Sequence, residues 1–306
     1  MAEINPVLMK DLRGRMRGAP AFLLLTLYLG ILSAMALLVY VGVSDSAAND
    51  PNAGQQIGES LLYLITGVSL VQVCVITPLL TAGSIAGEKE RQTYDLLIGS
   101  LLTPWQIVWG KLSAALAYAG LLVLGVIPLL SIAFLFGGVS PVEVLIVLAG
   151  LLASALLYAC VGLFWSALLR STVMAGALAL ATVLTVQLGI PFLALIASLV
   201  FGPLTALWAG SAPLVYLAGL LLCLHPFLSL YQTDVFLRTD QGLVFLFWDL
   251  PSGGRLLLPS PWLGFVAMAL LLSAGLLLLT VRLIRPDAPP AGPPPARSAR
   301  AERDAA

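Results

Sequence analysis

The sequence predicts an all-α protein that crosses a membrane about six times. Of its 306 residues, 60% are hydrophobic and only 10% are charged, which leaves too few polar side chains to cover a soluble globule of this size. Several uncharged runs also exceed the roughly 20 residues that a helix needs to cross about 30 Å of hydrocarbon. Inside a bilayer a helix satisfies its own backbone hydrogen bonds, so we expect these runs to be helices.

An amphipathic helix on the membrane surface is expected before the first span, over residues 1–20. Asn5 is suited to cap this helix, and apolar side chains recur along one of its faces. On the opposite face, Lys10, Arg13 and Arg17 would meet lipid phosphates. The segment is therefore predicted to lie on the cytoplasmic surface and to connect to the first span.

Six apolar runs, uncharged except for Lys111, are long enough to span the bilayer, and together they make residues 21–283 a single membrane domain. The predicted spans are 21–43, 60–86, 107–136, 144–169, 172–201 and 262–281. The first is not expected to be a cleaved signal peptide, because its apolar core is too long and no small-residue cleavage site follows it.

The segment 204–224 is uncharged but lies in a region broken by prolines, and it could be a seventh span or an element that does not cross. With six spans and a cytoplasmic amino end, only Arg238 and Arg255 of the 15 lysines and arginines fall outside the cell. A seventh span would place the arginine-rich tail outside. We therefore expect 204–224 to be re-entrant or interfacial, with both termini cytoplasmic, and the proline-rich tail 284–306 to be disordered.

A charged stretch, "GEKERQTYDLLIGSLLTPWQIVWGK", joins the second span to the third and is predicted to face the cytoplasm. Its charged and apolar side chains have helical spacing: Glu88, Arg91 and Asp95 on one side, Tyr94 and Leu97 on a neighbouring side. A solvated loop that follows the positive-inside rule would account for the basic residues. It would not account for the interleaved acids or the exposed apolar residues, so a protein partner is favoured.

The same stretch ends in the start of the third span. In "TPWQ", Thr103 is placed to cap the helix and Gln106 to complete a capping box. Trp105 and Trp109 lie one turn apart and fit the lipid headgroup region, and Lys111 is expected to reach the same interface.

These motifs resemble the type 2 ABC transporter permeases, the exporter-like class. The stretch "GEKERQTYDLLIGSLLTPWQIVWGKL" is similar to the cytoplasmic loop of that class, and "NPVLMKDLRGRMRGAPAFLLLTLYL" is similar to its amino-terminal helix and first span. A weaker likeness covers "LHPFLSLYQTDVFLR" before the last span. One position departs from the pattern, because Gln92 stands where the class would have glycine.

The resemblance implies a permease subunit of an exporter in a bacterial inner membrane. Its charged loop would be a coupling helix seated in a groove of a separate ATPase, which would bind the ATP and magnesium, and a second copy or a paralogue would complete the transport path. The residues implied in coupling are Glu88, Arg91, Tyr94, Asp95 and Leu97, with Arg170 in a second, smaller contact. The alternative is a membrane-embedded scaffold or maturation factor that moves no cargo.

Several other activities are excluded by the residue patterns. The "GK" pair at Gly110 and Lys111 is followed by Leu112 rather than serine or threonine, so it is not a phosphate-binding loop and the chain is not expected to be an enzyme. The sole histidine, His225, has no serine motif or carboxylate pair beside it. The three cysteines lie apart in apolar runs, without metal-ligand spacing, so no metal site or bound cofactor is expected.

Polar residues inside the spans are few and mark a possible transport pathway. The candidates are Gln72, Thr77 and Gln187. In a bilayer such side chains normally face other helices or a cavity. Because the first five spans hold no charge except Lys111 at the start of the third, an amphiphilic or lipid-like cargo, or a large one passing between subunits, is favoured over an ion.

Overall fold

The fold is described from a computed structural model of the chain. The residues it describes are 9, 19–46, 50–99, 102–201, 212–239, 242–250 and 254–284. The expected surface helix, with Lys10, Arg13 and Arg17, and the expected disordered tail therefore lie almost entirely outside the described residues.

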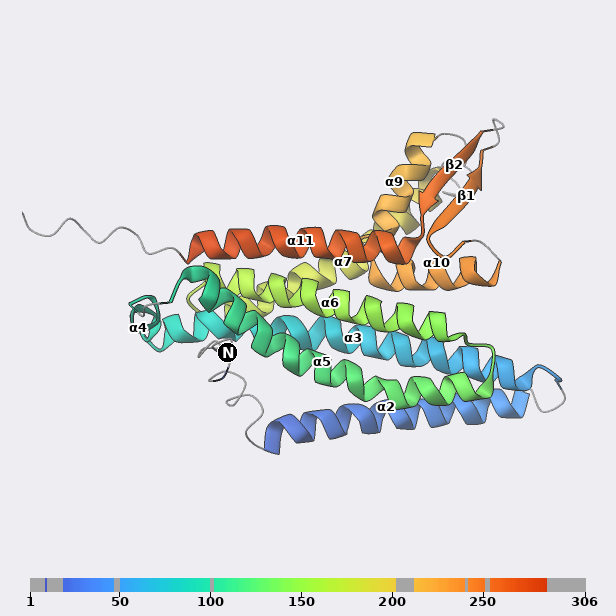
Figure 1. Cartoon of the computed structure of the whole chain (residues 1–306), viewed down its shortest axis with the longest axis horizontal. Coiled ribbons are helices and arrows are strands. Elements are labelled where there is room, and N and C mark those ends of the chain that lie inside the picture. The colour runs from blue at the N-terminus through green and yellow to red at the C-terminus, as the bar shows by residue number, and fades with distance from the viewer. Residues whose placement is uncertain are drawn as a thin grey trace, which may run out of the picture.

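Six long helices run side by side along the long axis of the molecule (Figure 1). They are α2 (Ala19–Ser46), α3 (Ala53–Glu90), α5 (Pro104–Phe136), α6 (Pro141–Leu168), α7 (Thr172–Phe201) and α11 (Pro261–Leu283). Within the described ranges, these six are long and apolar enough to cross a membrane. The predicted all-α, multi-spanning membrane protein is confirmed, and each predicted span falls on one of these helices.

Two of the long helices start with a capping box. At the start of α5, the Thr103 hydroxyl accepts a hydrogen bond from the Gln106 N–H, and the Gln106 side chain accepts one from the Thr103 N–H. Ser140 and Glu143 form the same arrangement at the start of α6. In both helices proline follows the cap, where its missing N–H costs nothing. The start predicted at Thr103 is therefore confirmed.

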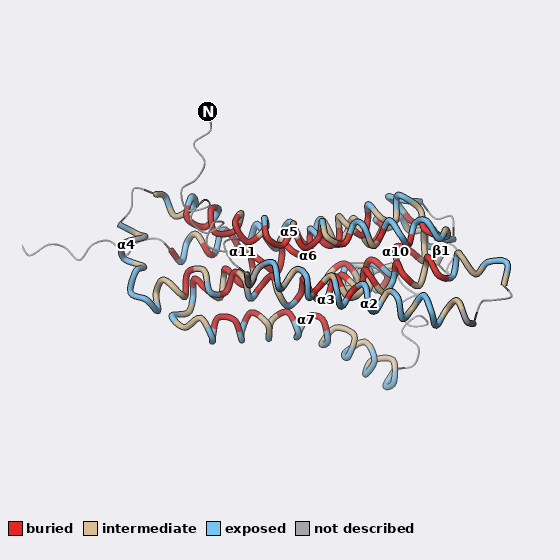
Figure 2. The backbone as a smooth tube through the Cα atoms, turned by 90° about the horizontal axis from the view of Figure 1, so that it is seen from below, coloured by how far each residue is buried: buried red, intermediate tan, exposed pale blue. Residues whose placement is uncertain are grey.

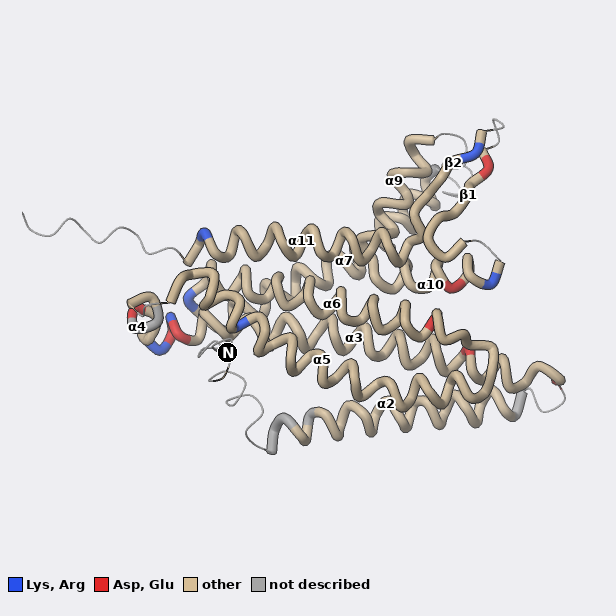
Figure 3. The backbone as a smooth tube through the Cα atoms, in the orientation of Figure 1, with Lys and Arg blue, Asp and Glu red and all other residues tan. Residues whose placement is uncertain are grey.

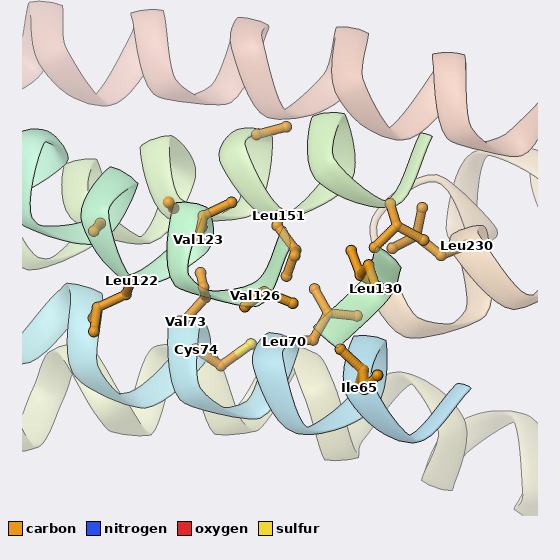
Figure 4. Close-up of a cluster of buried hydrophobic side chains, with 14 of the residues drawn as sticks. Ile65, Leu70, Val73, Cys74, Leu122, Val123, Val126, Leu130, Leu151 and Leu230 are labelled. Carbon is orange, nitrogen blue, oxygen red and sulfur yellow. The ribbon is translucent and has the colours of Figure 1, made fainter. Parts of the chain in front are cut away.

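The core lies where α3, α5 and α6 face one another, and much of α2 and α7 is exposed (Figure 2). Figure 4 shows leucine, valine and isoleucine side chains from these helices interdigitating around Leu70 and Leu151. Helices α3 and α6 approach each other closely at Gly162, where a Cβ atom would lie 2.1 Å from the Thr81 hydroxyl oxygen and 2.3 Å from the Pro78 carbonyl oxygen. Only glycine fits there, as is common where membrane helices pack closely.

One end of the bundle carries a short helical pair and a β-hairpin, and we call it the hairpin end (Figure 1). Helices α9 (Ala212–Leu222) and α10 (Pro226–Arg238) meet at a bend of 116°. Each is shorter than the roughly 20 residues a span needs. Strands β1 (Phe245–Asp249) and β2 (Arg255–Pro259) then pair antiparallel, with Leu246 opposite Leu258. The expectation that 204–224 is re-entrant or interfacial remains a prediction, and the hairpin was not predicted.

The opposite end carries α4 (Tyr94–Ile98), and we call it the α4 end. Charged residues gather toward the two ends of the bundle (Figure 3). The basic residues at the ends of helices and in the turns of the α4 end are Lys89, Arg91, Lys111, Arg170 and Arg282, whereas the hairpin end has Arg238 and Arg255 among the described residues.

Candidate functional site

The charged stretch is two helical segments with a sharp turn between them, not one amphipathic helix. Helix α3 continues through Glu90 and is capped at Arg91. Gln92 then takes a left-handed conformation, with φ of 57°, before α4 begins. The N–H of Gln92 bonds to the Lys89 carbonyl at 3.2 Å, and the N–H of Thr93 bonds to the Glu88 carbonyl at 2.9 Å. This is a Schellman helix ending, in which glycine is the usual left-handed residue.

The turn corrects the expectation that Glu88, Arg91 and Asp95 share one helix face. Glu88 belongs to α3 and Asp95 to α4, so the two carboxylates sit on different segments. The left-handed conformation of Gln92 accounts for the glycine that was expected at this position. A side chain in this region of backbone space crowds the following carbonyl, and glycine has none.

Glu88 turns inward and forms an ion pair with Lys111 of α5. The Lys111 Nζ lies 3.0 Å from Glu88 Oε1 and donates to the Ser84 carbonyl at 2.8 Å. The side chain of Lys111 is 2% exposed and that of Glu88 is 17% exposed. The expectation that Lys111 reaches the lipid headgroups is therefore wrong, because it finds its counter-charge within the bundle.

The next two charges of the stretch bind two other helices. The Lys89 ammonium donates to the Ala167 carbonyl at the end of α6. The Glu90 carboxylate accepts from the Thr172 N–H at 3.2 Å and from its hydroxyl at 2.8 Å, at the start of α7. A carboxylate at the start of a helix accepts a hydrogen bond from a free backbone N–H, and its negative charge interacts favourably with the helix dipole. We call Glu88, Lys89 and Glu90 the clamp, because they tie the end of α3 to α5, α6 and α7.

Helix α4 is seated on the bundle by its apolar side chains. Tyr94 and Ile98 pack against a buried cluster that includes Ile85, Val108 and Ile284. The Lys89 Nζ also lies 5.3 Å from the centre of the Tyr94 ring. Tyr94 is thus half-buried against its own chain, whereas it was predicted to anchor a partner. The side chain of Leu97, the other predicted anchor, lies outside the described residues.

Three of the predicted coupling residues do point outward. Arg91, Asp95 and Arg170 are exposed at the α4 end. Arg170 lies in the short turn between α6 and α7, next to the clamp residues Lys89 and Glu90. We call Arg91, Asp95 and Arg170 the outer charges. They carry both signs of charge and lie at the same end of the bundle as the clamp.

Two exposed tryptophans lie at the start of α5. Trp105 and Trp109 are 46% and 48% exposed, and their rings stack with centroids 5.9 Å apart. Their predicted position at the lipid headgroups, where amphipathic rings are favoured, remains a prediction.

The three predicted pathway residues are buried in the helix packing. The Gln187 side-chain amide donates to the Tyr158 hydroxyl at 2.6 Å and to the Cys74 sulfur at 3.2 Å, and the Gln187 backbone carbonyl accepts from the His225 ring at 2.9 Å. Gln72 is 9% exposed and Thr77 is 1% exposed. Neither lines the two cavities described below, nor does Gln187. A role for them in a pathway remains a prediction.

Sequence reasoning missed a charged network at the hairpin end. Arg238 of α10 pairs with Glu59 of α3 and, at 2.8 Å, with Asp234, whose carboxylate also accepts from the Tyr63 hydroxyl. This network borders a cavity of about 290 Å³ between α3, α6 and α10. The signal was the presence of isolated charges in an apolar chain, but Glu59 and Tyr63 of α3 lie more than 170 positions from their partners in α10.

The hairpin end also holds a second cavity, of about 540 Å³. It lies between α9, α10, the two strands and the start of α11. No charged side chain lines it among the described residues.

Comparison with known proteins gives one match. A family model described as "ABC-2 family transporter protein" matches residues 6–236, more than half of the chain. The matched range includes the clamp, α4 and the outer charges, and it ends within α10. No curated protein matches the chain.

Proposed function

The chain belongs to the ABC-2 family of transporter proteins, and from this premise we propose that it couples ATP hydrolysis by a separate ATPase subunit to export. As a member, it is a multi-pass membrane permease subunit of an ABC transporter. The ATPase would dock at the α4 end, bind ATP and magnesium itself, and leave this chain to form the membrane path.

The clamp, which lies at the same end of the bundle as the outer charges, is the observation that carries the proposal. A partner that contacts Arg91, Asp95 and Arg170 touches both α4 and the α6–α7 turn. A movement of the partner would be transmitted to α3, which precedes α4 in the chain. The contacts of the clamp would then transmit it to α5, α6 and α7. Separating Glu88 from Lys111 would leave a largely buried charge without its counter-charge, which is costly. The ends of α3 and α5 would therefore move together.

The structural setting of Gly110 and Lys111 supports a separate ATPase. Gly110 and Lys111 lie within α5, where Lys111 is buried and paired with Glu88. A phosphate-binding lysine must instead lie free in a glycine-rich loop at a helix start. The family itself consists of membrane subunits without an ATPase of their own.

The positions of the basic residues and the exposure of α2 and α7 support the proposed membrane orientation and the proposed pairing with a second subunit. The basic residues at the α4 end favour a cytoplasmic position for that end. Both termini would then lie on the cytoplasmic side of a bacterial inner membrane. In their apolar windows, only 11% of α2 and 6% of α7 is buried. These faces are available for lipid and for a second copy or paralogue, which we propose completes the transport path.

Reversing an outer charge tests the docking surface without disturbing the clamp. Asp95→Lys is expected to reduce co-purification with the ATPase and to lower ATP-dependent transport in vesicles, while the permease still inserts. Asp249→Lys is the matched control, since Asp249 is also exposed but lies at the hairpin end. Tyr94→Ala is a poorer choice, because Tyr94 packs against its own chain.

Two outcomes would contradict the proposal. If Asp95→Lys keeps full assembly and transport while Asp249→Lys loses them, the ATPase does not dock at the α4 end. If the ATPase co-purifies but ATP drives no flux of any cargo, the scaffold alternative is correct.

A further inference from the structure

The cavity of about 540 Å³ at the hairpin end is a second candidate site, independent of the docking surface. Its floor is the start of α11, its sides are α9 and α10, and strands β1 and β2 cover it. The cover is fixed at three points. Tyr216 of α9 donates to the Leu257 carbonyl at 3.2 Å, the Ser260 N–H donates to the Val244 carbonyl at 2.8 Å, and Trp262 donates to the Leu243 carbonyl at 3.0 Å.

The cavity extends into the depth of the bilayer. It is lined by Pro261, Gly264 and Met268, which lie on the first two turns of a membrane-spanning helix. The seven steps along the helix from Pro261 to Met268 rise about 10 Å at about 1.5 Å per residue. The cavity therefore begins near the end of the span and follows α11 toward the membrane interior, along the direction that lipid chains take.

The elements around the cavity present apolar surfaces on their outer sides too. On the hairpin, Leu246 faces inward and is 4% exposed, whereas Phe247 and Leu257 face outward and are 60% and 50% exposed. On α9, Leu217 is 53% exposed. A two-stranded ribbon that is apolar on both faces is poorly suited to water, so we place the cover in lipid.

The chemistry of the lining selects an apolar ligand. Among the described residues that line the cavity, Gln232 is the only side chain with an amide, and none carries a charge. The volume falls within the roughly 300–1,000 Å³ of typical ligand sites. Apolar cavities exclude water, which needs two to four polar partners, and accept hydrocarbon instead.

We propose that this cavity holds an acyl chain of a membrane lipid. The chain would lie along α11 beneath the hairpin, with the lipid headgroup near Gln232 at the end of the span. A bound chain would fill the space between the hairpin and the bundle, and so would fix the hairpin in place. The proposal concerns the permease alone and needs neither the ATPase nor ATP.

Photolabelling with a lipid of known structure tests the site. The purified permease is reconstituted, without ATP or the ATPase, with a phosphatidylglycerol that carries a diazirine on one acyl chain. After illumination, we expect adducts on the peptides that contain Cys223 and Met268. Gly219→Leu should abolish these adducts by filling the cavity, because a Cβ there meets only Leu258, at 3.9 Å.

The matched control is Gly275→Leu on α11. A Cβ at Gly275 meets nothing within 4 Å, and the residue lies outside the lining of the cavity. It adds the same side chain and should leave the labelling unchanged. Met268→Trp fills the cavity from the opposite wall, so it tests the site independently if Gly219→Leu fails to fold.

The outcomes separate this inference from the proposed function. Loss of the adducts in both filling variants, with the control unchanged, supports the site whatever the ATPase does. Unchanged adducts in a folded filling variant, or no adduct in the wild-type protein while exposed residues of α7 are labelled, would overturn it.

Discussion

Removing Lys111, the ion-pair partner of the clamp residue Glu88, should destabilise the permease far more than removing a similar ion pair at the surface. In Lys111→Met, the Glu88 carboxylate loses its cation at 3.0 Å, and the Ser84 carbonyl loses its donor at 2.8 Å. Because the Lys111 side chain is only 2% exposed, little water can replace it. Breaking a buried pair from one side costs about 3–5 kcal/mol, and we expect about 3, since Glu88 is 17% exposed.

The control is Arg255→Met in the hairpin. Arg255 pairs with Asp249 at 2.8 Å, but the two side chains are 73% and 71% exposed. Such pairs contribute about 0–1 kcal/mol. The unfolding free energy of each variant would be measured in the same detergent micelles, for example by steric trapping.

A double variant distinguishes lost pairing from lost packing. Glu88→Gln combined with Lys111→Met removes both charges, so no unpaired buried charge remains. It should be more stable than Lys111→Met alone. If the two substitutions instead add within about 0.5 kcal/mol, the two side chains are not coupled, and the reasoning on the clamp is wrong.

Three further predictions concern the backbone and the topology. Gln92→Gly should stabilise the protein by about 1 kcal/mol, seen as a higher unfolding midpoint, because glycine adopts the left-handed turn without strain; an equal gain from Thr93→Gly would argue against this cause. Gly162→Ala should cost several kcal/mol, about the effect of an overpacked core, whereas Gly275→Ala, which meets nothing within 4 Å, should stay near the wild type; equal stabilities would contradict the close approach of α3 and α6. Cysteines at Asn52 and Thr93 should react with an impermeant thiol reagent from opposite sides of the membrane, and labelling of both in intact cells would refute the orientation.

The spans could be read from the sequence because each one depends on local composition. The predicted span 107–136 agrees with α5, Pro104–Phe136, because the apolar run and the capping residues before it are both local features of the sequence. The predicted 60–86 is too short, because α3 runs from Ala53 to Glu90 through Glu59 and Glu88. Those charges are paired with Arg238 and Lys111 on other helices. An uncharged run ends at its first charge, but a helix need not.

The hairpin was missed for a different reason. Residues 245–249 and 255–259 are rich in aromatic and branched side chains, and a segment with two glycines joins them, which is a hairpin signal. In a chain with so many apolar residues, this signal does not stand out against the helical runs. Hydropathy, which defines the spans, also does not predict that Leu246 pairs with Leu258.

The division of the charged stretch into clamp and outer charges depends on one backbone conformation. Glu88 and Asp95 are seven residues apart, about two turns at 3.6 residues per turn, so a continuous helix would place them on the same face. The left-handed turn at Gln92 breaks that relation, after which Glu88 is held by Lys111 and Asp95 is exposed. Spacing alone cannot separate the two roles, because the sequence shows neither the turn nor the distant lysine. The same break gives the coupling proposal its physical basis, since a partner can contact Asp95 on α4 without displacing the charges that join α3 to its neighbours.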